Sequence, residues 1–486
     1  MKNLCIHIFV LTIMLLFVSS KPPKDYYDEK YRPQFHFTPE KNWHNDPNGL
    51  VYYDGEYHMF YQYNPKGKEW GYMHWGHAVS KDLLHWEHLP VAIYPDENST
   101  HKVNCTAFSG SAIVDKQNLL GKQTGNEKTL VAFYTSKNCG QRIAYSTDKG
   151  RTWNKYEGNP VISHNEADDA RDPKVIWHDP SQKYVMVLYR KPEGDDKSKG
   201  VSFYTSDNLI DWNWESHIAG FFECPDLVQL QVTNRPEEKK WVLFDGDGSY
   251  LIGKFDGKLF TAETPKLKSD WGKNYYATQT WSNIPEEDGR TIQIAWMRGC
   301  EFPDMPFNGQ MIFPCELSLT KFNYGYKLIR KPVEEIVKLH GKAYEWENEN
   351  LIPGLKKNLV RRVKNDCLHI IGTFDIKTAD TFGFYIRNDK KTSGTEVLYD
   401  VKRGVLAVLG NNVPLLPMDG KIKLEVLVDR ASVEIFANDG QVVVSNCFLP
   451  DEGADELVLF NSGGELMVDK LNIYEVESVW QKEKQN

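Results

Sequence analysis

The feature that most constrains this chain is a short polar or small-residue motif that returns just ahead of successive β-rich segments. The five motifs centre on Asp46, Ser109, Asp172, Glu223 and Ala277, and successive centres lie 63, 63, 51 and 54 residues apart. A unit of this length is too short for a domain and too long for a hairpin, but it suits one four-stranded propeller blade. The spacing therefore predicts a five-bladed β-propeller.

A second repeat, in a different register, supports this interpretation. A Ser-Asp or Ser-x-Asp turn followed by Trp occurs three times, led by Ser80, Ser146 and Ser206, which lie 66 and 60 residues apart. Between these motifs the chain consists of short alternating or apolar segments broken by Asp-Gly, Asn-Pro and Gly turns, and long helical periodicity is absent. We therefore predict an all-β fold.

The pattern changes in the last third of the chain. At 486 residues the sequence is too long for one ordinary core, so two domains are expected. We predict a propeller at 21–329, a more charged linker at 330–342, and a second domain at 343–486. That domain has alternating strands, an Asn438-Asp439-Gly440 hairpin signal and no converging acids of its own. These features predict a C-terminal β-sandwich.

The first 20 residues are predicted to be a signal peptide. They contain a positive residue, Lys2, an apolar run from Ile8 to Val18 interrupted only by Thr12, and small residues ending at Ser20. The run is too short to span a membrane comfortably. We expect cleavage after Ser20 and a secreted, extracellular protein that is not anchored to a membrane.

Charge, cysteines and sequons narrow the partners further. Removing the signal peptide takes away Lys2 and no acid, so the formal charge goes from −9 to −10, which argues against nucleic acid or an anionic membrane as a partner. Cys5 also leaves, and seven of the eight cysteines remain, so at least one is outside any intramolecular disulfide. Asn98 and Asn104 begin sequons and are predicted glycosylation sites.

Three of the five motif centres are acids. Because the first strand of each blade lines the central channel, Asp46, Asp172 and Glu223 should meet at one end of one axis. An alternative is that Asp-Pro and Glu-x-Pro only punctuate strand starts. Three carboxylates in one register make this alternative the weaker one, because such groups repel and cost stability unless they are used. Glycosidic bond cleavage needs a carboxylic acid and a carboxylate on opposite faces of the bond.

The neighbours of two acids suggest different protonation states. Arg171, next to Asp172, is expected to lower the pKa of that carboxyl and keep it ionised. Glu223 is surrounded in sequence by Phe221, Phe222 and Cys224, apolar company that favours the protonated form of a general acid. We interpret Cys224 as a buried thiol rather than a redox nucleophile, since no His or Lys follows closely to activate it.

Nine sequence motifs occur in order along nearly the whole mature chain. They are Trp43-His44-Asn45-Asp46-Pro47-Asn48-Gly49, Tyr61-Gln62-Tyr63-Asn64-Pro65, Met73-His74-Trp75-Gly76-His77, Phe108-Ser109-Gly110-Ser111, Arg171-Asp172-Pro173, Glu223-Cys224-Pro225-Asp226, Tyr276-Ala277, Ala295-Trp296-Met297 and Asp429-Arg430-Ala431-Ser432-Val433-Glu434-Ile435-Phe436. These motifs resemble those of the invertase, levanase and inulinase family of glycoside hydrolases, the β-fructofuranosidases of the family 32 type.

The resemblance implies a five-bladed propeller plus β-sandwich that hydrolyses with retention and without a metal or organic cofactor. It implies Asp46 as the nucleophile, Glu223 as the general acid and base, and Asp172 as a stabiliser of the transition state through fructose hydroxyls. Retention would place the carboxyls of Asp46 and Glu223 about 5–5.5 Å apart. The implied substrate-binding residues are Asn45, Gln62, Trp70, Phe108, Ser109, Arg171, Tyr276 and Trp296.

Two positions depart from the family pattern. His44 stands where the family usually has Met; we favour a neutral packing role over an effect on the pH profile. Cys315 replaces the Arg of a Pro-Arg-Glu-Leu motif, and the sequence leaves open whether that Arg serves structure or substrate. The histidines of residues 74–88 invite a metal-site interpretation, but aromatic packing is favoured because no Cys or acid completes a ligand set.

The expected function is hydrolysis of terminal non-reducing β-D-fructofuranosides, with sucrose favoured as the substrate. The alternatives are a fructan hydrolase, such as a levanase or inulinase, and a fructosyltransferase. A different class, a fructan-binding protein on an inactive hydrolase scaffold, is disfavoured because all three acids are present. The sequence does not distinguish a monomer from a homodimer.

Overall fold

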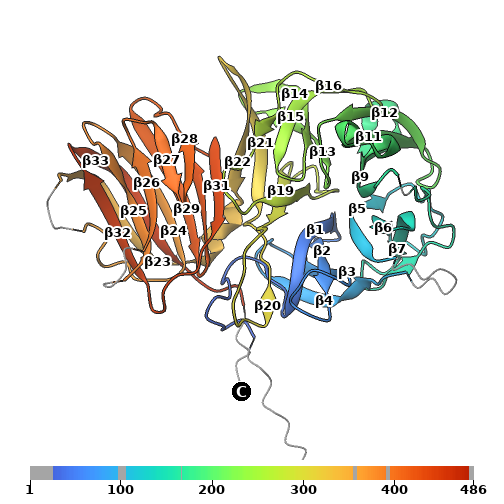
Figure 1. Ribbon diagram of the computed structural model, residues 1–486, viewed down its shortest axis with the longest axis horizontal. Helices are drawn as coiled ribbons and strands as arrows, with labels where there is room; N and C mark the ends of the chain where they lie inside the picture. Colours follow the sequence, from blue (N-terminus) through green and yellow to red (C-terminus); the bar gives the residue numbers. More distant parts are fainter. Residues whose placement is uncertain (1–25, 97–104, 166, 354–357, 390–393, 481–486) are drawn as a thin grey trace, which may run out of the picture.

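The computed structural model describes residues 26–96, 105–165, 167–353, 358–389 and 394–480, and the fold is almost entirely β-structure (Figure 1). Strands β1 to β22 form a ring of blades, and strands β23 to β33 form a layered unit beside it. The predicted all-β architecture, a five-bladed propeller followed by a β-sandwich, is confirmed. The signal peptide predicted at residues 1–20 and the sequons at Asn98 and Asn104 lie outside the described residues.

The blades follow one another along the chain. Blade 1 has β1 (Asn42–Tyr53), β2 (Glu56–Asn64), β3 (His74–Ser80) and β4 (Trp86–Ile93). Blade 2 has β5 (Ala107–Asp115), β6 (Thr129–Ser136), β7 (Gly140–Ser146) and β8 (Asn154–Lys155). Blade 3 has β9 (Arg171–His178), β10 (Lys183–Arg190), β11 (Gly200–Ser206) and β12 (Asn213–Ala219). Blade 4 has β13 (Asp226–Val232), β14 (Arg235–Phe244), β15 (Ser249–Phe255), β16 (Phe260–Ala262) and β17 (Leu267–Lys268). Blade 5 has β18 (Tyr276–Thr280), β19 (Thr291–Trp296), β21 (Cys315–Phe322) and β22 (Gly325–Pro332).

Backbone pairings and shared apolar clusters connect neighbouring blades. Strand β20 (Phe307–Asn308) leaves blade 5 and pairs in parallel with β1, which links the last blade to the first. Blades 4 and 5 are joined into one sheet by the pairing of Val232 with Leu319. Each pair of neighbouring blades also shares an apolar cluster, such as Phe60 and Trp75 of blade 1 against Tyr134 of blade 2. Closure of the ring protects most strand edges, as in other propellers.

The Ser-Asp-Trp repeat is the turn between the third and fourth strands of blades 1 to 3. In each turn the lead serine ends the third strand, at Ser80, Ser146 and Ser206. The indole N–H of the following Trp donates to the carbonyl oxygen three residues earlier, at 3.0 Å in all three blades. The repeat predicted from sequence therefore has one structural cause, a turn that closes the outer part of each blade.

The inner strands carry the same irregularity at the position of the motif. In β1, β5, β9 and β18 one extra residue is inserted between two paired positions, so the register with the second strand shifts by one. The shifts fall between His44 and Pro47, Ala107 and Gly110, Arg171 and Lys174, and Tyr276 and Gln279. Such a β-bulge re-aims side chains out of the regular alternation. The proline N of Pro47 and Pro173 has no hydrogen to donate to the ladder, which suits the break.

Polar side chains cross-link the inner strands below the motifs. Ser111 on β5 donates to the carbonyl of Pro173 at 2.8 Å and accepts from the amide of Val175 at 2.9 Å, both on β9. The buried Lys174 lies 2.9 Å from a carboxylate oxygen of Asp226 on β13 and donates to the carbonyl of Thr280 on β18 at 2.9 Å. These bonds fix the inner strands relative to one another, so the residues at their heads are held in place.

The sandwich consists of two antiparallel sheets around an apolar core. One sheet has the order β23 (His340–Leu351), β33 (Leu466–Val476), β24 (Leu368–Asp375), β29 (Lys421–Asp429), β30 (Ser432–Ala437) and β31 (Val442–Cys447). The other has the order β28 (Asn411–Pro414), β27 (Val405–Val408), β26 (Thr395–Asp400), β25 (Thr381–Asn388) and β32 (Glu456–Ser462). Side chains from both inner faces, including Phe374, Phe382, Val426 and Ile435, fill the space between them.

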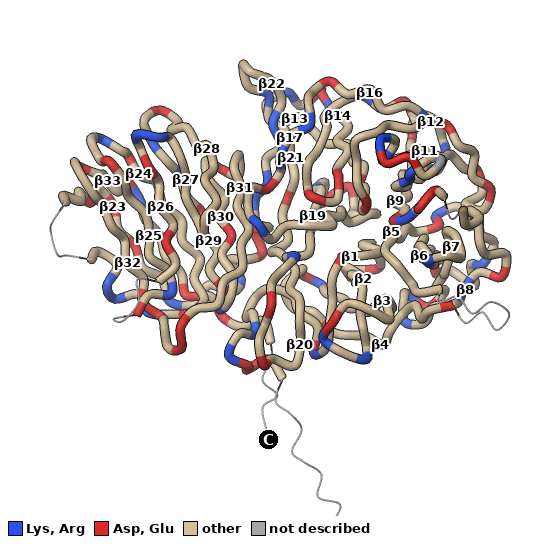
Figure 2. The backbone as a smooth tube through the Cα atoms, in the orientation of Figure 1, with Lys and Arg blue, Asp and Glu red and all other residues tan. Residues whose placement is uncertain are grey.

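The helical content of the described residues is limited to 3-10 turns: η1 (Asp179–Ser181), η2 (Pro192–Gly194), η3 (Asp196–Ser198) and η4 (Glu334–Leu339). The stretch at 330–342 holds the end of β22, η4 and the start of β23; the domain boundaries we expected from sequence stay a prediction. Within the described ranges, no helix is long and apolar enough to span a membrane. Acidic and basic residues are interspersed along the described chain of both domains (Figure 2).

A continuous core and one covalent bond connect the two domains. Propeller residues such as Met297 and Phe313 and sandwich residues such as Phe436 and Val443 belong to one buried cluster. Among the described cysteines, Cys300 of the propeller forms a disulfide with Cys447 of the sandwich, and Cys105 pairs with Cys139. Cys224, Cys315 and Cys367 are free thiols. The domains therefore have a large apolar interface rather than a flexible linkage.

His36 is the polar centre of this junction. Its ring lies between two buried carboxylates of the sandwich, 2.8 Å from Asp429 and 2.7 Å from Glu434. Burial lowers the pKa of His36, but the hydrogen bonds to both carboxylates outweigh burial and raise the pKa to about 9. Asp429 also accepts the amide hydrogens of Gln34 and Phe35. The motif at 429–436 thus anchors the N-terminal segment to the sandwich.

We expect His36→Gln to lower the free energy of unfolding by about 3–5 kcal/mol at pH 6, because it leaves two buried carboxylates without a cation. The folded pKa of His36 lies above its ordinary value of 6.5, so the stabilisation is complete below pH 6.5 and is lost as the pH rises through 9. Denaturant unfolding at pH 6 and pH 9.5 measures the difference. The half-exposed His85 gives a matched control, His85→Gln, which should change stability little. An equal loss in the His36 variant at both pH values would contradict the ion-pair account.

Candidate active site

The inner strands open into one pocket at the end of the propeller axis. The pocket has a volume of about 240 Å³, and every catalytic and substrate-binding residue predicted from sequence lines it. Its lining residues are Asn45, Asp46, Gln62, Trp70, Phe108, Ser109, Arg171, Asp172, Glu223, Tyr276, Trp296 and Arg298. The three acids come from three different blades, on β1, on β9 and just before β13. The bulges of β1, β5, β9 and β18 lie at this end of the strands.

Asp46 is held by hydrogen bonds to both of its carboxylate oxygens. The hydroxyl of Ser109 donates to one oxygen at 2.6 Å, and the side-chain amide of Asn45 donates to the other at 3.1 Å. Burial raises the pKa of Asp46 and the nearby charge of Glu223 adds to the rise, while the two hydrogen bonds oppose it. The two hydrogen bonds thereby fix the orientation of the carboxylate.

Glu223 contacts a cation and a phenol. Arg171 donates to one carboxylate oxygen at 3.2 Å through both Nε and Nη2, and Tyr276 donates to the other at 2.5 Å. Phe221 is buried, but Phe222 is exposed. The surroundings of Glu223 are therefore less apolar than we expected from its sequence neighbours, because residues from β9 and β18 supply polar contacts.

Asp172 differs from the expectation in its protonation. Burial raises the pKa of Asp172 to about 7, although Arg171 lowers it, and the charges of Glu223 and Asp46 add to the rise. The predicted direction of the Arg171 effect is therefore correct, but the expectation that this effect keeps the pKa of Asp172 low is wrong, because burial outweighs it. The guanidinium is 3.8 Å from Asp172 but 2.6 Å from Asp169 and 3.2 Å from Glu223, so its charge is shared among three carboxylates.

Cys224 lies between the acids. Its thiol is 3.6 Å from a carboxylate oxygen of Asp46 and 3.6 Å from one of Asp172, and its amide donates to Asp172 at 3.0 Å. Burial raises the pKa of this thiol, and the surrounding acids raise it further. The thiol is therefore protonated, which agrees with the interpretation that Cys224 is not a redox nucleophile, although the residue is half-buried and not buried as expected.

The backbone at these positions adopts a conformation that L-residues rarely use. Asp172, Glu223 and Cys224 have φ angles of 63°, 47° and 45°. A left-handed conformation at a residue other than glycine costs energy and is typical of functional sites, where the surrounding structure enforces it. Gly246 packs beside the Glu223 turn, where an added Cβ would lie 2.9 Å from the Phe222 carbonyl oxygen.

Sequence reasoning missed one lining residue, Arg298. Its guanidinium lies 4.4 Å from the centre of the Tyr276 ring, and the side chain is exposed at the rim. The available signal was its position two residues after Trp296, in the turn that follows β19. Trp296 itself packs against Trp43 at 5.8 Å between ring centroids, and Trp70 contacts Phe108 at 6.0 Å. The rim is thus aromatic and basic, whereas the floor is acidic.

The two departures from the family pattern lie outside the pocket lining. His44 is fully buried between Phe37 and Tyr61, and burial lowers its pKa to about 3, so the ring is neutral. Cys315 is buried at the domain junction, where Arg330 of the neighbouring strand lies 4.0 Å from its sulfur. Arg330 in turn pairs with Asp270 at 3.1 Å. Cys315 therefore contacts the interdomain network and not the pocket.

The histidines of residues 74–88 are engaged in packing and hydrogen bonds. His77 stacks on Phe60 at 4.0 Å, His88 contacts the hydroxyl of Tyr61, and His85 bonds to Asp82 at 3.0 Å. In the part of the chain that the structure describes, no group of three or more His, Cys, Asp or Glu side chains is arranged to hold a metal ion.

Two sequence-family models match the chain. One, described as the N-terminal domain of glycosyl hydrolases family 32, matches residues 36–332, and the other, described as the C-terminal part of the same family, matches residues 335–475. The chain belongs to glycoside hydrolase family 32. It is therefore a glycoside hydrolase, and the pocket at the propeller axis is the candidate site of that activity.

Individual members of family 32 are similar over most of the chain. It is 42% identical to a levanase of Bacillus subtilis (strain 168), over 97% of this chain and 74% of that protein. It is 32% identical to an extracellular exo-inulinase of Aspergillus awamori, over 93% of this chain and 96% of that one. The crystal structure of exo-inulinase from Aspergillus awamori matches with a TM-score of 0.81 at 30% identity, over 93% of this chain and 100% of that chain.

Proposed function

We propose that this family 32 enzyme hydrolyses terminal β-fructofuranosyl bonds of fructans by a retaining double displacement. The observation that carries the proposal is the convergence of Asp46, Asp172 and Glu223 on one small pocket. A retaining glycosidase needs one carboxylate to attack carbon and one carboxylic acid to protonate the leaving oxygen. The different surroundings of the acids support different roles.

Asp46 is proposed as the nucleophile. Its carboxylate, oriented by Ser109 and Asn45, would attack the anomeric carbon and form a fructosyl ester as the glycosidic bond breaks. Glu223 is proposed as the acid that donates a proton to the leaving oxygen. It would then take a proton from the water that cleaves the ester, and Arg171 and Tyr276 hold it in position.

Asp172 is proposed to bind fructose hydroxyls and to stabilise positive charge at the transition state. It lies deep in the pocket, with its amide bonded to Thr135 and its carboxylate bonded to the amide of Cys224. The fructose pocket is proposed to be formed by Asn45, Gln62, Trp70, Phe108, Ser109, Arg171, Tyr276 and Trp296. A hydroxyl that binds a buried carboxylate replaces water in a site of low polarity, where the contact is strong.

For the substrate, the relatives support fructan over the sucrose that we favoured from sequence. The similar proteins are named levanase and exo-inulinase, and these names refer to fructan polymers. The pocket is also bordered by a hollow of about 310 Å³ that shares Glu223 with it and leaves room for sugar units beyond the first. A specialist for sucrose needs space for only one such unit.

We also propose that the protein is secreted and works outside the cell. Two disulfides between the described cysteines support this, because disulfides persist in oxidising compartments. Cleavage after Ser20 and glycosylation at Asn98 and Asn104 belong to the same proposal.

Initial rates of fructose release from levan, inulin and sucrose, measured side by side, test the function. We expect release of single fructose units from at least one polymer with a kcat/KM about tenfold or more above that for sucrose, since added sugar contacts stabilise the transition state. Higher efficiency on sucrose would overturn the fructan assignment in favour of an invertase. Transfer products in place of free fructose would indicate a fructosyltransferase, and binding without release would exclude an enzyme.

A further inference from the structure

The pocket is bordered by two hollows on opposite flanks, and only one can receive the leaving group. The first, of about 310 Å³, lies over blades 2 and 3 and shares Trp70, Phe108, Arg171 and Glu223 with the pocket. The second, of about 480 Å³, lies toward the sandwich and shares Tyr276 and Arg298 with the pocket. Volume alone would favour the second hollow.

The position of the general acid decides between them. Glu223 lines the pocket and the first hollow, and it is not among the residues that line the second. The group that protonates the glycosidic oxygen must reach it within hydrogen-bond distance. The sugar attached through that oxygen therefore continues past Glu223. We propose that the hollow over blades 2 and 3 binds the fructosyl unit next to the scissile bond, and that the turn 136–140 determines the preference for fructan. This inference rests on the proposed function and names the subsite that selects its substrate.

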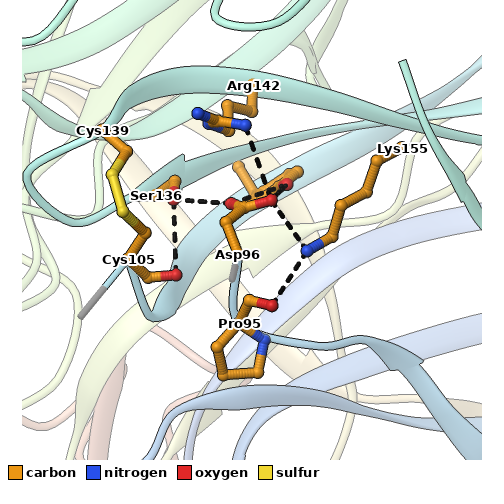
Figure 3. The surroundings of a disulfide bond; sticks show 8 residues. Pro95, Asp96, Cys105, Ser136, Cys139, Arg142 and Lys155 are labelled. Atoms are coloured by element: carbon orange, nitrogen blue, oxygen red, sulfur yellow. Dashed lines mark hydrogen bonds and ion pairs between the residues drawn. A yellow bond between two sulfur atoms is a disulfide. The ribbon is translucent and has the colours of Figure 1, made fainter. Parts of the chain in front are cut away.

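The turn 136–140 connects β6 to β7 and is fixed at its tip. Cys139 forms the disulfide with Cys105 (Figure 3). The amide of Lys137 donates to the carbonyl of Thr106 at 3.1 Å. Ser136 donates to Asp96 at 2.7 Å, and Lys155 and Arg142 point at the same carboxylate from 2.7 and 3.5 Å. A covalent bond and a buried carboxylate with several partners hold this turn far more firmly than an ordinary hairpin tip.

The anchored turn and its neighbours present groups suited to a sugar. Lys137, Asn138, His164 and Asp169 line the hollow, with exposed side chains that donate or accept hydrogen bonds. Trp70 and Phe108 supply aromatic surface at its border, and the Lys137 ammonium lies 5.3 Å from the Phe108 ring centre. Sugar rings bind to such mixtures of aromatic faces and polar groups, because they have both C–H faces and hydroxyl edges.

Gly140 brings the other wall of the hollow into place. An added Cβ at this residue would lie 2.3 Å from the carbonyl oxygen of Ile162 and 3.0 Å from the amide of His164. Only a glycine lets this segment approach, so that Ile162 can pair with Gln141 and His164 can line the hollow beside the turn. Two loops of blade 2 are thereby held against each other.

The β6–β7 hairpin also holds Asp172, the proposed stabiliser of the transition state. Thr135, one residue before the turn, accepts the amide hydrogen of Asp172 at 2.9 Å and donates to Gln141 at 2.7 Å. Gln141 donates to the carbonyl of Ala170 at 3.0 Å. One rigid hairpin therefore positions both the subsite and Asp172. A sugar bound at the turn is held at a fixed position relative to the reacting bond.

The test compares a substrate that fills the subsite with one that leaves it empty. Methyl β-D-fructofuranoside has only a methyl leaving group, whereas an inulin or levan trisaccharide places a fructosyl unit beyond Glu223. We expect Lys137→Ala/Asn138→Gly to lower the ratio of kcat/KM for the trisaccharide to that for the methyl fructoside by about tenfold, since it removes two side chains that hydrogen-bond to the sugar. Glycine is used at position 138 because Asn138 has a φ of 64°, which alanine would strain.

The second hollow provides the matched control. Asp247→Asn/Lys268→Ala changes two exposed polar residues that line it, and this variant should keep the wild-type ratio. A fall of the ratio in the control with no fall in Lys137→Ala/Asn138→Gly would overturn the inference and place the leaving group on the sandwich side. A wild-type protein that cleaved neither substrate would overturn the proposed function as well, so the two failures are distinguishable.

The disulfide is tested in the same assay. Cys105→Ser/Cys139→Ser should lower the same ratio, because the turn loses its covalent anchor, and circular dichroism at the assay temperature checks that the variant is folded. A wild-type ratio in this folded variant would overturn the positioning role of the disulfide.

Discussion

Replacing Asp46 with alanine is expected to abolish hydrolysis of every fructoside, with a loss in kcat of at least about 10⁴-fold. In the proposed mechanism Asp46 forms the covalent intermediate, and the other two acids are engaged elsewhere: Glu223 by Arg171 and Tyr276, and Asp172 by the amide of Cys224. Neither can take its place without moving. Stopped assays of fructose release, with enzyme at high concentration, measure the residual rate.

The same substitution should leave the fold intact. Burial raises the pKa of Asp46, so the ionised carboxylate costs the folded protein stability above pH 4. Alanine removes that charge and also two hydrogen bonds, and we expect the two effects to nearly cancel in the thermal midpoint. Asp247→Asn, an exposed acid nearby, should keep full activity. An active Asp46→Ala enzyme would overturn the assignment of the nucleophile.

The register of the motifs was sufficient to predict where the acids meet. Asp46, Ser109 and Asp172 each mark the inner strand of a blade, and a propeller turns such a sequence repeat directly into a ring. The bulges could not be predicted, because a one-residue insertion in one strand is only defined against its partner. The bulges change the direction in which the motif residues point. The sequence therefore predicted the location of the site but not the backbone irregularities that shape it.

Burial explains why the pKa of Asp172 differs from the prediction. The influence of Arg171 on Asp172 was inferred from their adjacency in sequence, and the bulge of β9 does bring both side chains to the pocket, but the inference left out the burial of Asp172. In the structure Arg171 reaches Asp169 and Glu223 more closely than Asp172, and burial outweighs its effect on the Asp172 pKa. The carboxylates nearest to the Arg171 guanidinium are those of Asp169, in the loop before β9, and Glu223, from the next blade, and the adjacency of Arg171 to Asp172 in sequence did not reveal this sharing.

At the domain junction, the partners of a motif cannot be predicted from the motif itself. The motif at 429–436 resembled that of the family, yet its role depends on His36, which is 393 residues from Asp429 in the chain. The same holds for the disulfide between Cys300 and Cys447, which are 147 residues apart. Contacts over such distances in sequence follow from domain packing, and no local pattern predicts them.

The second large effect is expected for Glu223→Ala. Loss of the general acid should lower kcat on fructan by about 10²–10⁴-fold, because the leaving alkoxide then departs without a proton. Fructosyl fluoride, whose leaving group needs no proton, should form the ester at close to the wild-type rate. Glu223→Gln, which keeps the side-chain volume, should behave like the alanine variant. An equal loss on fructan and on the fluoride would argue against a role in leaving-group protonation.

The product formed with azide then assigns both acids at once. In Glu223→Ala acting on β-fructosyl fluoride, the ester on Asp46 lacks a base to activate water. Added azide should therefore attack the ester directly, raise the rate of fluoride turnover and yield β-fructosyl azide after two inversions. In Asp46→Ala, azide can only enter from the face that the carboxylate vacated, and the fluoride should give the α-azide after one inversion. The anomeric configuration, read by NMR, therefore separates nucleophile from acid and base. The α-azide from the Glu223 variant would reverse the two assignments.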